Sequence, residues 1–128
     1  MEIGEELRPS PLVVSREQLV RYAGAADDYN PIHYDDAAAQ SFGLPGVIVH
    51  GMLNMGLMTH YVLDQLPAGS QVVSFTVRFR SMVVPDQPIR VSARVRSLKE
   101  NLAEFEVQLF QSGDKAAVAG RMRVQVSQ

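Results

Sequence analysis

The sequence contains no cysteine. It therefore cannot form a disulfide, present a thiolate nucleophile, or bind zinc or an iron–sulfur cluster through sulfur. It also lacks an apolar run long enough to span a bilayer, and its acidic N-terminal stretch has no apolar core of signal-peptide type. These absences exclude thiol enzymes and lead us to expect a cytoplasmic protein without a membrane partner.

A strong net charge is missing as well, since the formal value is −2 at pH 7. Residues 1–77 carry three basic and nine acidic groups, whereas residues 78–128 carry nine basic and five acidic groups. The excess arginines lie in strand-like segments, where we expect them to face glutamates on the solvated side of a sheet. Because neither uniform basicity nor interleaved aromatic residues occur, no nucleic-acid partner is indicated.

The length of 128 residues, with 46% apolar content, is typical of a single globular domain covering residues 1–128. A strand-like segment at 7–14 comes first, helix signals follow, and strands fill the second half, which predicts an α+β fold. Ser15 and Gln18 have the form of a capping box before one helix. Asp35 is expected to cap a second, short helix.

A third segment, from His50 to Leu66, is apolar almost all the way round, which predicts a helix buried on most sides. Gly51 and Gly56 within it are expected to let a sheet or another backbone approach closely. Four segments with alternating apolar residues follow, which predicts an antiparallel sheet whose one apolar face curls around this helix. The alternating residues are Val73, Phe75, Val77 and Phe79; Ile89, Val91, Ala93 and Val95; Phe105, Val107 and Leu109; and Val118, Met122, Val124 and Val126.

The segment from Asp28 to His33, DYNPIH, carries the most informative pattern in the chain. Asn30 before Pro31 favours an extended or turned backbone, because a residue before proline is pushed out of the helical region. The stiffened loop lies between two predicted helices and presents a carboxylate and an imidazole. Such a pair can share one water molecule, as general acid/base catalysis requires.

The start of the apolar helix, Val49-His50-Gly51-Met52, is the second feature of chemical interest. The first N–H groups of a helix have no partner within it and lie at the positive end of the helix dipole. They can therefore stabilise negative charge that develops on a substrate oxygen. We expect His50 to cap the helix or pack near its start rather than to act chemically.

Two runs, YAGAADDYNPIHYDDAAA and GVIVHGMLNMGL, lie within residues 22–57. Together they resemble the (R)-specific enoyl-CoA hydratases and MaoC-like dehydratases, including the mycobacterial 3-hydroxyacyl-carrier-protein dehydratase subunits. The family pattern is roughly G-D-x-N-P-x-H with a downstream H-G-M. The resemblance implies a hot dog fold, in which a curved antiparallel sheet wraps around a central buried helix.

Carried over by position, the resemblance makes Asp28 and His33 the catalytic pair, Gly51 the donor of an oxyanion-binding N–H, and Asn30 a residue that orients the loop or the water. It implies a hydro-lyase that interconverts trans-2-enoyl and (R)-3-hydroxyacyl thioesters by moving water across the 2,3-bond. The acyl carrier is expected to be coenzyme A or an acyl carrier protein. A homodimer is expected, with a heterodimer as the alternative, and no cofactor is implied.

One position departs from the family pattern, since Asp27 stands where the family commonly has glycine. A second carboxylate next to Asp28 is expected to perturb its ionisation or to displace the loop. Two other functions stay open: an acyl-CoA thioesterase of the same fold, and an inactive partner subunit of a heterodimeric dehydratase. The pairing of Asp28 with His33 argues against both. No metal site is predicted, because His33, His50 and His60 lack a recognised ligand spacing.

Overall fold

The computed structural model describes residues 1–128, with Ser10 through its backbone alone. Strand β1 and three helical segments come first, then the long helix α3, then four strands, which is the order that the sequence predicts. The bounds are β1 Ser10–Val13, α1 Arg16–Ala26, the 3-10 turn η1 Pro31–His33, α2 Asp36–Ser41, α3 Gly51–Asp64, β2 Gln71–Phe79, β3 Pro88–Lys99, β4 Leu102–Phe110 and β5 Val118–Gln125.

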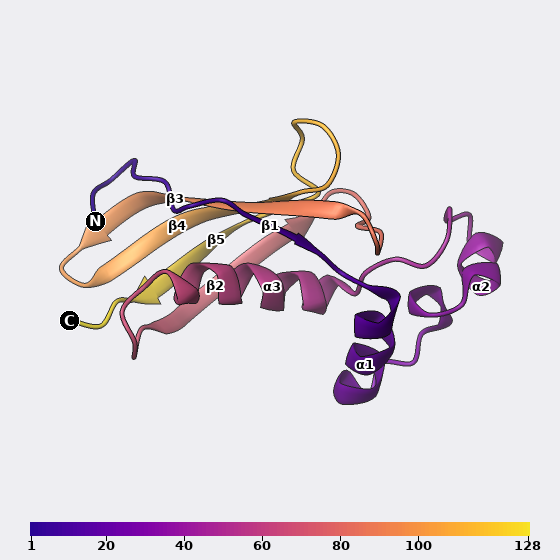
Figure 1. Cartoon of the computed structure of the whole chain (residues 1–128). Helices are drawn as coiled ribbons and strands as arrows, with labels where there is room; N and C mark the ends of the chain where they lie inside the picture. The colour runs from indigo at the N-terminus through magenta and orange to yellow at the C-terminus, as the bar shows by residue number, and fades with distance from the viewer.

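The strands form one antiparallel sheet in the order β1-β3-β4-β5-β2, so β1 and β2 are its edges. Helix α3 lies along one face of this sheet (Figure 1). Helices α1 and α2, with η1 between them, lie beyond one end of the sheet, while both chain termini lie at the other end. The predicted α+β class is confirmed, and the segments that carry the motifs meet at one end of the molecule.

Strand β4 shows why this sequence forms a one-sided sheet. Every second residue from Ala103 to Leu109 is fully buried, and the residues between them are half-exposed. On the outer face Glu106 lies opposite Arg94 of β3 on one side and Arg121 of β5 on the other. The expectation that arginines face glutamates is confirmed, and each such cross-strand pair contributes roughly 0.2–1 kcal/mol.

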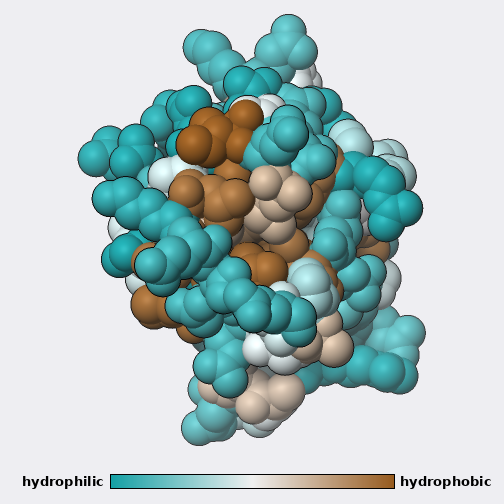
Figure 2. Space-filling model, turned by 90° about the vertical axis from the view of Figure 1, so that its left-hand side faces the viewer, coloured by the Kyte–Doolittle hydropathy of each residue, from teal (hydrophilic) through white to brown (hydrophobic). Residues whose placement is uncertain are grey.

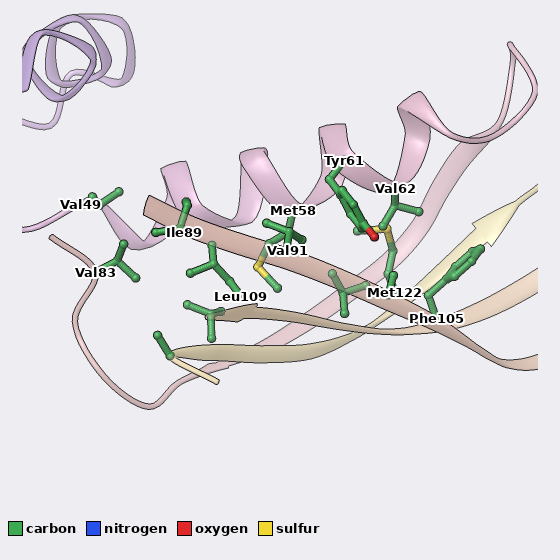
Figure 3. Packing of buried hydrophobic residues seen from close by; sticks show 14 of the residues in the cluster. Val49, Met58, Tyr61, Val62, Val83, Ile89, Val91, Phe105, Leu109 and Met122 are labelled. Atoms are coloured by element: carbon green, nitrogen blue, oxygen red, sulfur yellow. The ribbon is translucent and has the colours of Figure 1, made fainter. Parts of the chain in front are cut away.

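Helix α3 covers the apolar face of the sheet with Met58, Tyr61 and Val62, which point toward the strands (Figure 3). They join one buried cluster with Val91 of β3 and Leu109 of β4. Burying a side chain of this size contributes about 1.5–3 kcal/mol, so the contact between α3 and the sheet is a main source of stability. At the end of the molecule away from α1 and α2, apolar residues reach the surface and are surrounded by largely hydrophilic residues (Figure 2).

The opposite side of α3 is open in the single chain. Met52 and His60 are exposed, and a Cβ added at Gly56 meets nothing within 4 Å. The expectations of a helix buried on most sides and of a close backbone approach at Gly56 are therefore wrong for the isolated chain. A sheet along one side of a helix cannot cover the other side.

Within the part of the chain that the structure describes, no helix has the length and apolarity to cross a bilayer.

Strand β2 departs from the predicted alternation. Its pairing with β5 shifts register between Val72 and Ser74, so that Val72 packs against the core and Val73 is 57% exposed. Such an irregularity resets which residue of the strand faces inward. Phe79, which was expected on the apolar face, is 52% exposed at the end of the strand. The predictions for Val73 and Phe79 are therefore wrong, whereas Phe75 and Val77 pack against the core as expected.

Gly120 in β5 is a position where the sheet tolerates no side chain. A Cβ there would overlap the carbonyl oxygen of Thr76 and lie 2.8 Å from Cγ1 of Val77. We predict that Gly120→Ala lowers the free energy of unfolding by about 3 kcal/mol, the cost of overpacking against a backbone that cannot move aside. The measurement is urea unfolding. Gly56→Ala is the matched control and is expected to raise stability by about 0.5–1 kcal/mol, since open space surrounds Gly56 within a helix. Equal losses in both variants would contradict this account.

Candidate active site

The loop that carries the predicted acid/base pair begins at the end of α1. Asp27 ends this helix in the left-handed conformation, with φ 54°, and its N–H donates to the carbonyls of Ala23 and Gly24. Glycine adopts this conformation without steric cost, and aspartate is among the few other residues that tolerate it. The position where the sequence departs from the glycine of the family pattern is thus a helix cap. Asp27 is exposed there, and the adjoining turn is formed.

Short-range hydrogen bonds hold the loop itself. The carboxylate of Asp28 accepts from the N–H of Asn30 at 3.3 Å, and the amide oxygen of Asn30 accepts from the N–H of Ile32 at 3.3 Å. Pro31 is the first residue of η1, where a proline fits because its missing N–H has no helical partner in any case. Asn30 is exposed, so the geometry gives its side chain a part in shaping the loop.

His33 is buried, and a backbone carbonyl fixes its ring. The N–H at Nδ1 donates to the carbonyl oxygen of Ile48 at 2.8 Å. A second bond, from the N–H of Ile48 to the carbonyl of Ile32 at 3.0 Å, ties the same two segments together. Because Nδ1 carries the proton of the neutral imidazole, the lone pair on Nε2 is free to accept a proton.

Asp28, His33 and His50 form one cluster. A carboxylate oxygen of Asp28 and ring nitrogens of the two histidines all lie within 4.8 Å of one another. His50 is the residue before α3, is 1% exposed, and stacks on His33 with ring centroids 3.8 Å apart and planes 21° apart. Tyr22 of α1 contacts the His50 ring edge-on at 4.7 Å. His50 is the N-cap residue of α3 but makes no side-chain capping bond, so of the two expected roles, capping or packing near the helix start, the structure confirms the packing.

This cluster is the group of described residues whose spacing comes nearest to that of a metal site. An imidazole binds a metal along the lone pair in its ring plane. The planes of His33 and His50 are stacked and nearly parallel, so one ion cannot lie close to both ring planes at once. The geometry therefore fits proton transfer better than metal binding.

Burial lowers the pKa of His50 below its usual 6.5, and repulsion from His33 lowers it further, against a smaller opposing effect of Asp28. Both ring nitrogens of His50 are enclosed and have no hydrogen-bond partner among the described residues. His50 is therefore neutral at pH 7. A neutral ring can stay stacked on His33 while His33 exchanges protons, because two imidazolium ions at this distance would repel each other.

A pocket of about 330 Å³ opens beside the cluster. His33, Gly51 and Asn54 line it together with Phe79, the last residue of β2, and with residues 80–83, which come directly after that strand. A larger hollow of about 710 Å³ lies over the charged outer face of the sheet and includes neither Asp28 nor His33 among its lining residues. The smaller pocket is consequently the one in which an acyl group could meet His33, and Asp28 lies beside His33 in the cluster without lining the pocket itself.

Gly51 is the first residue of α3, and the helical hydrogen bonds begin only with the N–H of Asn54, which donates to the carbonyl of His50. The N–H of Gly51 thus lies among the free donors of the helix start. A Cβ at Gly51 would lie 3.1 Å from the Phe79 ring, so the predicted close approach is real but comes from a side chain. The structure brings Asp28 against His33, brings His33 and Gly51 to one pocket, and leaves Asn30 on the loop.

The sequence reasoning missed two features of this site. One is the contact of His50 with His33, which depends on how η1 and α3 pack. The other is Asn54, which is 3% exposed and lines the pocket. An amide in the otherwise apolar run GMLNMGLM is the signal that could have identified Asn54.

We predict that His50→Phe weakens the pH dependence of folding stability. The unfolded chain takes up a proton at His50 near pH 6.5, whereas the folded chain takes it up only at lower pH, so wild-type stability falls as the pH drops below about 6.5. Phenylalanine preserves the stacked ring but does not titrate. Urea unfolding at a series of pH values between 5 and 8 measures the effect. The exposed His60 supplies the control, His60→Phe, which is expected to retain the wild-type slope; an unchanged slope in His50→Phe would rule the account out.

Comparison with known proteins places this geometry in a family. The MaoC like domain matches residues 1–117. The (R)-specific enoyl-CoA hydratase of Aeromonas caviae is 29% identical, over 98% of this chain and 96% of that protein. The mitochondrial 3-hydroxyacyl-[acyl-carrier-protein] dehydratase of Arabidopsis thaliana is 28% identical, over 92% of this chain and 72% of that protein.

Solved structures agree with the sequence comparison. The (R)-hydratase from A. caviae has a TM-score of 0.92 at 26% identity and covers 99% of this chain and 98% of its own. The R-hydratase PhaJ1 from Pseudomonas aeruginosa has a TM-score of 0.91 at 25% identity, over 100% of this chain and 83% of its own. The hot dog arrangement that the resemblance implied is confirmed, and the chain belongs to the MaoC-like domain family.

Proposed function

We propose that this protein is a hydro-lyase that adds water to, or removes it from, the 2,3-bond of an acyl thioester, interconverting trans-2-enoyl and (R)-3-hydroxyacyl forms. The observation that carries the proposal is the approach of the Asp28 carboxylate to the His33 ring, within 4.8 Å, at a pocket that also contains the start of α3. The names of the relatives, a hydratase and a dehydratase, describe the two directions of this one reaction.

The acid/base pair manages the water and the protons. In hydration, Asp28 and His33 bind one water molecule between them, and the free Nε2 of His33 takes a proton from it. The water oxygen then bonds to C3, the electrons of the double bond shift toward the carbonyl, and the proton taken up by His33 is delivered to C2. Dehydration reverses each of these steps, so the same two side chains serve both directions.

Negative charge develops on the thioester oxygen during this addition. The N–H of Gly51, at the positive end of α3, is the donor that we assign to that oxygen. The absence of a side chain at Gly51 leaves the N–H accessible beside the Phe79 ring. A larger residue at position 51 would have to displace that ring.

A thioesterase of the same fold needs its water directed at the carbonyl carbon instead of at C3. Nε2 of His33, with the carboxylate of Asp28 beside the ring, can remove a proton from water and, once protonated, deliver that proton to carbon. An inactive partner subunit needs neither group. We therefore rank hydration above both alternatives. The carrier is coenzyme A or an acyl carrier protein, because the name of one relative includes coenzyme A and the name of the other includes the acyl carrier protein.

Incubation with crotonyl-CoA tests the proposal. We expect loss of the enoyl absorbance without release of free thiol, because water adds to the 2,3-bond and the thioester stays intact. A parallel incubation with a saturated acyl-CoA is expected to release no thiol. Free thiol from either substrate, with no hydration, would identify a thioesterase instead. A series of enoyl chain lengths, beside an acyl-carrier-protein substrate, then defines the carrier and the chain preference.

Two pairs of variants connect the activity to the site. Asp28→Asn and His33→Ala are each expected to lower kcat by about 10²–10⁴-fold, the range for loss of a positioned acid or base. Asp27→Asn and His60→Ala are the matched controls, since both residues are exposed and asparagine also tolerates the left-handed conformation at 27. Wild-type turnover in Asp28→Asn or His33→Ala would refute the assignment.

We assign a homodimer as the assembly, with β2 in the contact. β2 is an edge strand, and Val73 and Phe79 on it are exposed. Met52 on the open side of α3 adds to this apolar surface. An unpaired strand edge with exposed apolar side chains favours pairing with another chain.

Sedimentation analysis is expected to give twice the chain mass of 14.1 kDa. Val73→Lys is expected to shift the equilibrium toward the single chain, because a charge would be buried in the contact. A stable single chain with full turnover would contradict the homodimer. An inactive single chain that gains activity from a second, different chain would favour the heterodimer.

A further inference from the structure

Asn54 is a buried polar residue that neither the fold nor the acid/base chemistry explains. Its side chain is 3% exposed and lines the same pocket as Gly51 and His33. Its amide oxygen Oδ1 is enclosed and has no hydrogen-bond partner among the described residues. An unpaired buried oxygen destabilises the folded chain, and leucine is also the better helix former. Stability alone therefore favours an apolar residue at this position.

The position of Asn54 on α3 directs its amide toward the reaction. It lies three residues after Gly51, so both residues are on the same face of the helix. Side chains of an α-helix tilt toward its N-terminus, which brings the carboxamide of Asn54 over the turn that contains the N–H of Gly51. Since Oδ1 is enclosed, Nδ2 with its two N–H groups is the end of the carboxamide left for a ligand in the pocket.

The rest of the pocket wall narrows the choice of ligand atom. Ile48, Val49 and Val83 are apolar and suit an acyl chain. The polar Arg80 and Ser81 also line the pocket, but they follow β2 and do not lie on α3. The substrate atom that gains negative charge is the thioester oxygen, and one backbone N–H is a weak site for it, because an oxyanion hole works with several converging donors. Asn54 is the uncharged side-chain donor on the face of α3 where that oxygen would lie.

We propose that Asn54 is a catalytic residue whose Nδ2–H donates a second hydrogen bond to the thioester oxygen, beside the N–H of Gly51. The inference rests on the proposed hydro-lyase function and names a donor that the motif resemblance does not include. The bond strengthens as charge builds on the oxygen, so its loss acts on kcat more than on KM. The unpaired amide is thus retained for the reaction at the expense of stability.

Asn54→Leu is the test, because leucine has nearly the same size but no donor. With crotonyl-CoA as substrate, we expect kcat to fall about 10²-fold, with a much smaller change in KM. The melting temperature is expected to stay level or to rise, since the enclosed unpaired oxygen is gone. Asn54→Gln retains a carboxamide one methylene farther out and is expected to keep more activity than Asn54→Leu.

Thr59→Val is the matched control. Thr59 is a half-buried polar residue on the same helix that lies outside the pocket lining, so its kcat is expected to remain that of the wild type. Wild-type kcat in Asn54→Leu would overturn this inference alone. If Asn54→Leu lowered the melting temperature as well as kcat, or if Thr59→Val lowered kcat to the same extent, Asn54 would have a structural role, and this would also overturn the inference. Absence of turnover by the wild type on every enoyl thioester would overturn the proposed function, and this inference with it.

Discussion

The hydrogen bond from the ring of His33 to the carbonyl of Ile48 is the contact on which the site depends. It joins η1, which carries the imidazole, to the segment that leads into α3, which carries the free N–H groups. The backbone bond from Ile48 to Ile32 closes the same junction from the other side. One short contact therefore sets both the tautomer of the imidazole and its position relative to the start of the helix. Without it, the backbone bond would still join the two segments, but the ring of His33 would no longer be held in one orientation.

Much of this architecture can be predicted from sequence, because its determinants are local. The proline of the loop, the caps at Ser15 and Asp35, and the alternation in β3 to β5 each act within a few residues. The proximity of Asp28 and His33 follows from the same short range. The capping box at Ser15 forms as the spacing predicts, with bonds in both directions.

The features that sequence reasoning misses depend on contacts between distant segments. The stack of His50 on His33 needs α3 to meet η1, and no local pattern encodes that distance. The exposure of Val73 follows from an irregular pairing of β2 with β5, which the apolar alternation of β2 conceals. The open side of α3 is a third case, since an apolar helix surface indicates burial without identifying what covers it.

The contact between Phe79 and Gly51 links the shape of the sheet edge to the chemistry. Phe79 ends the edge strand β2, and its ring lies against the first residue of α3. A second chain that pairs with β2 would fix the end of that strand and, through the ring, the space in front of the Gly51 N–H. If the proposed homodimer forms through β2, the protein's own concentration would then affect its turnover, since association and the geometry of the proposed oxyanion donor would be thermodynamically linked.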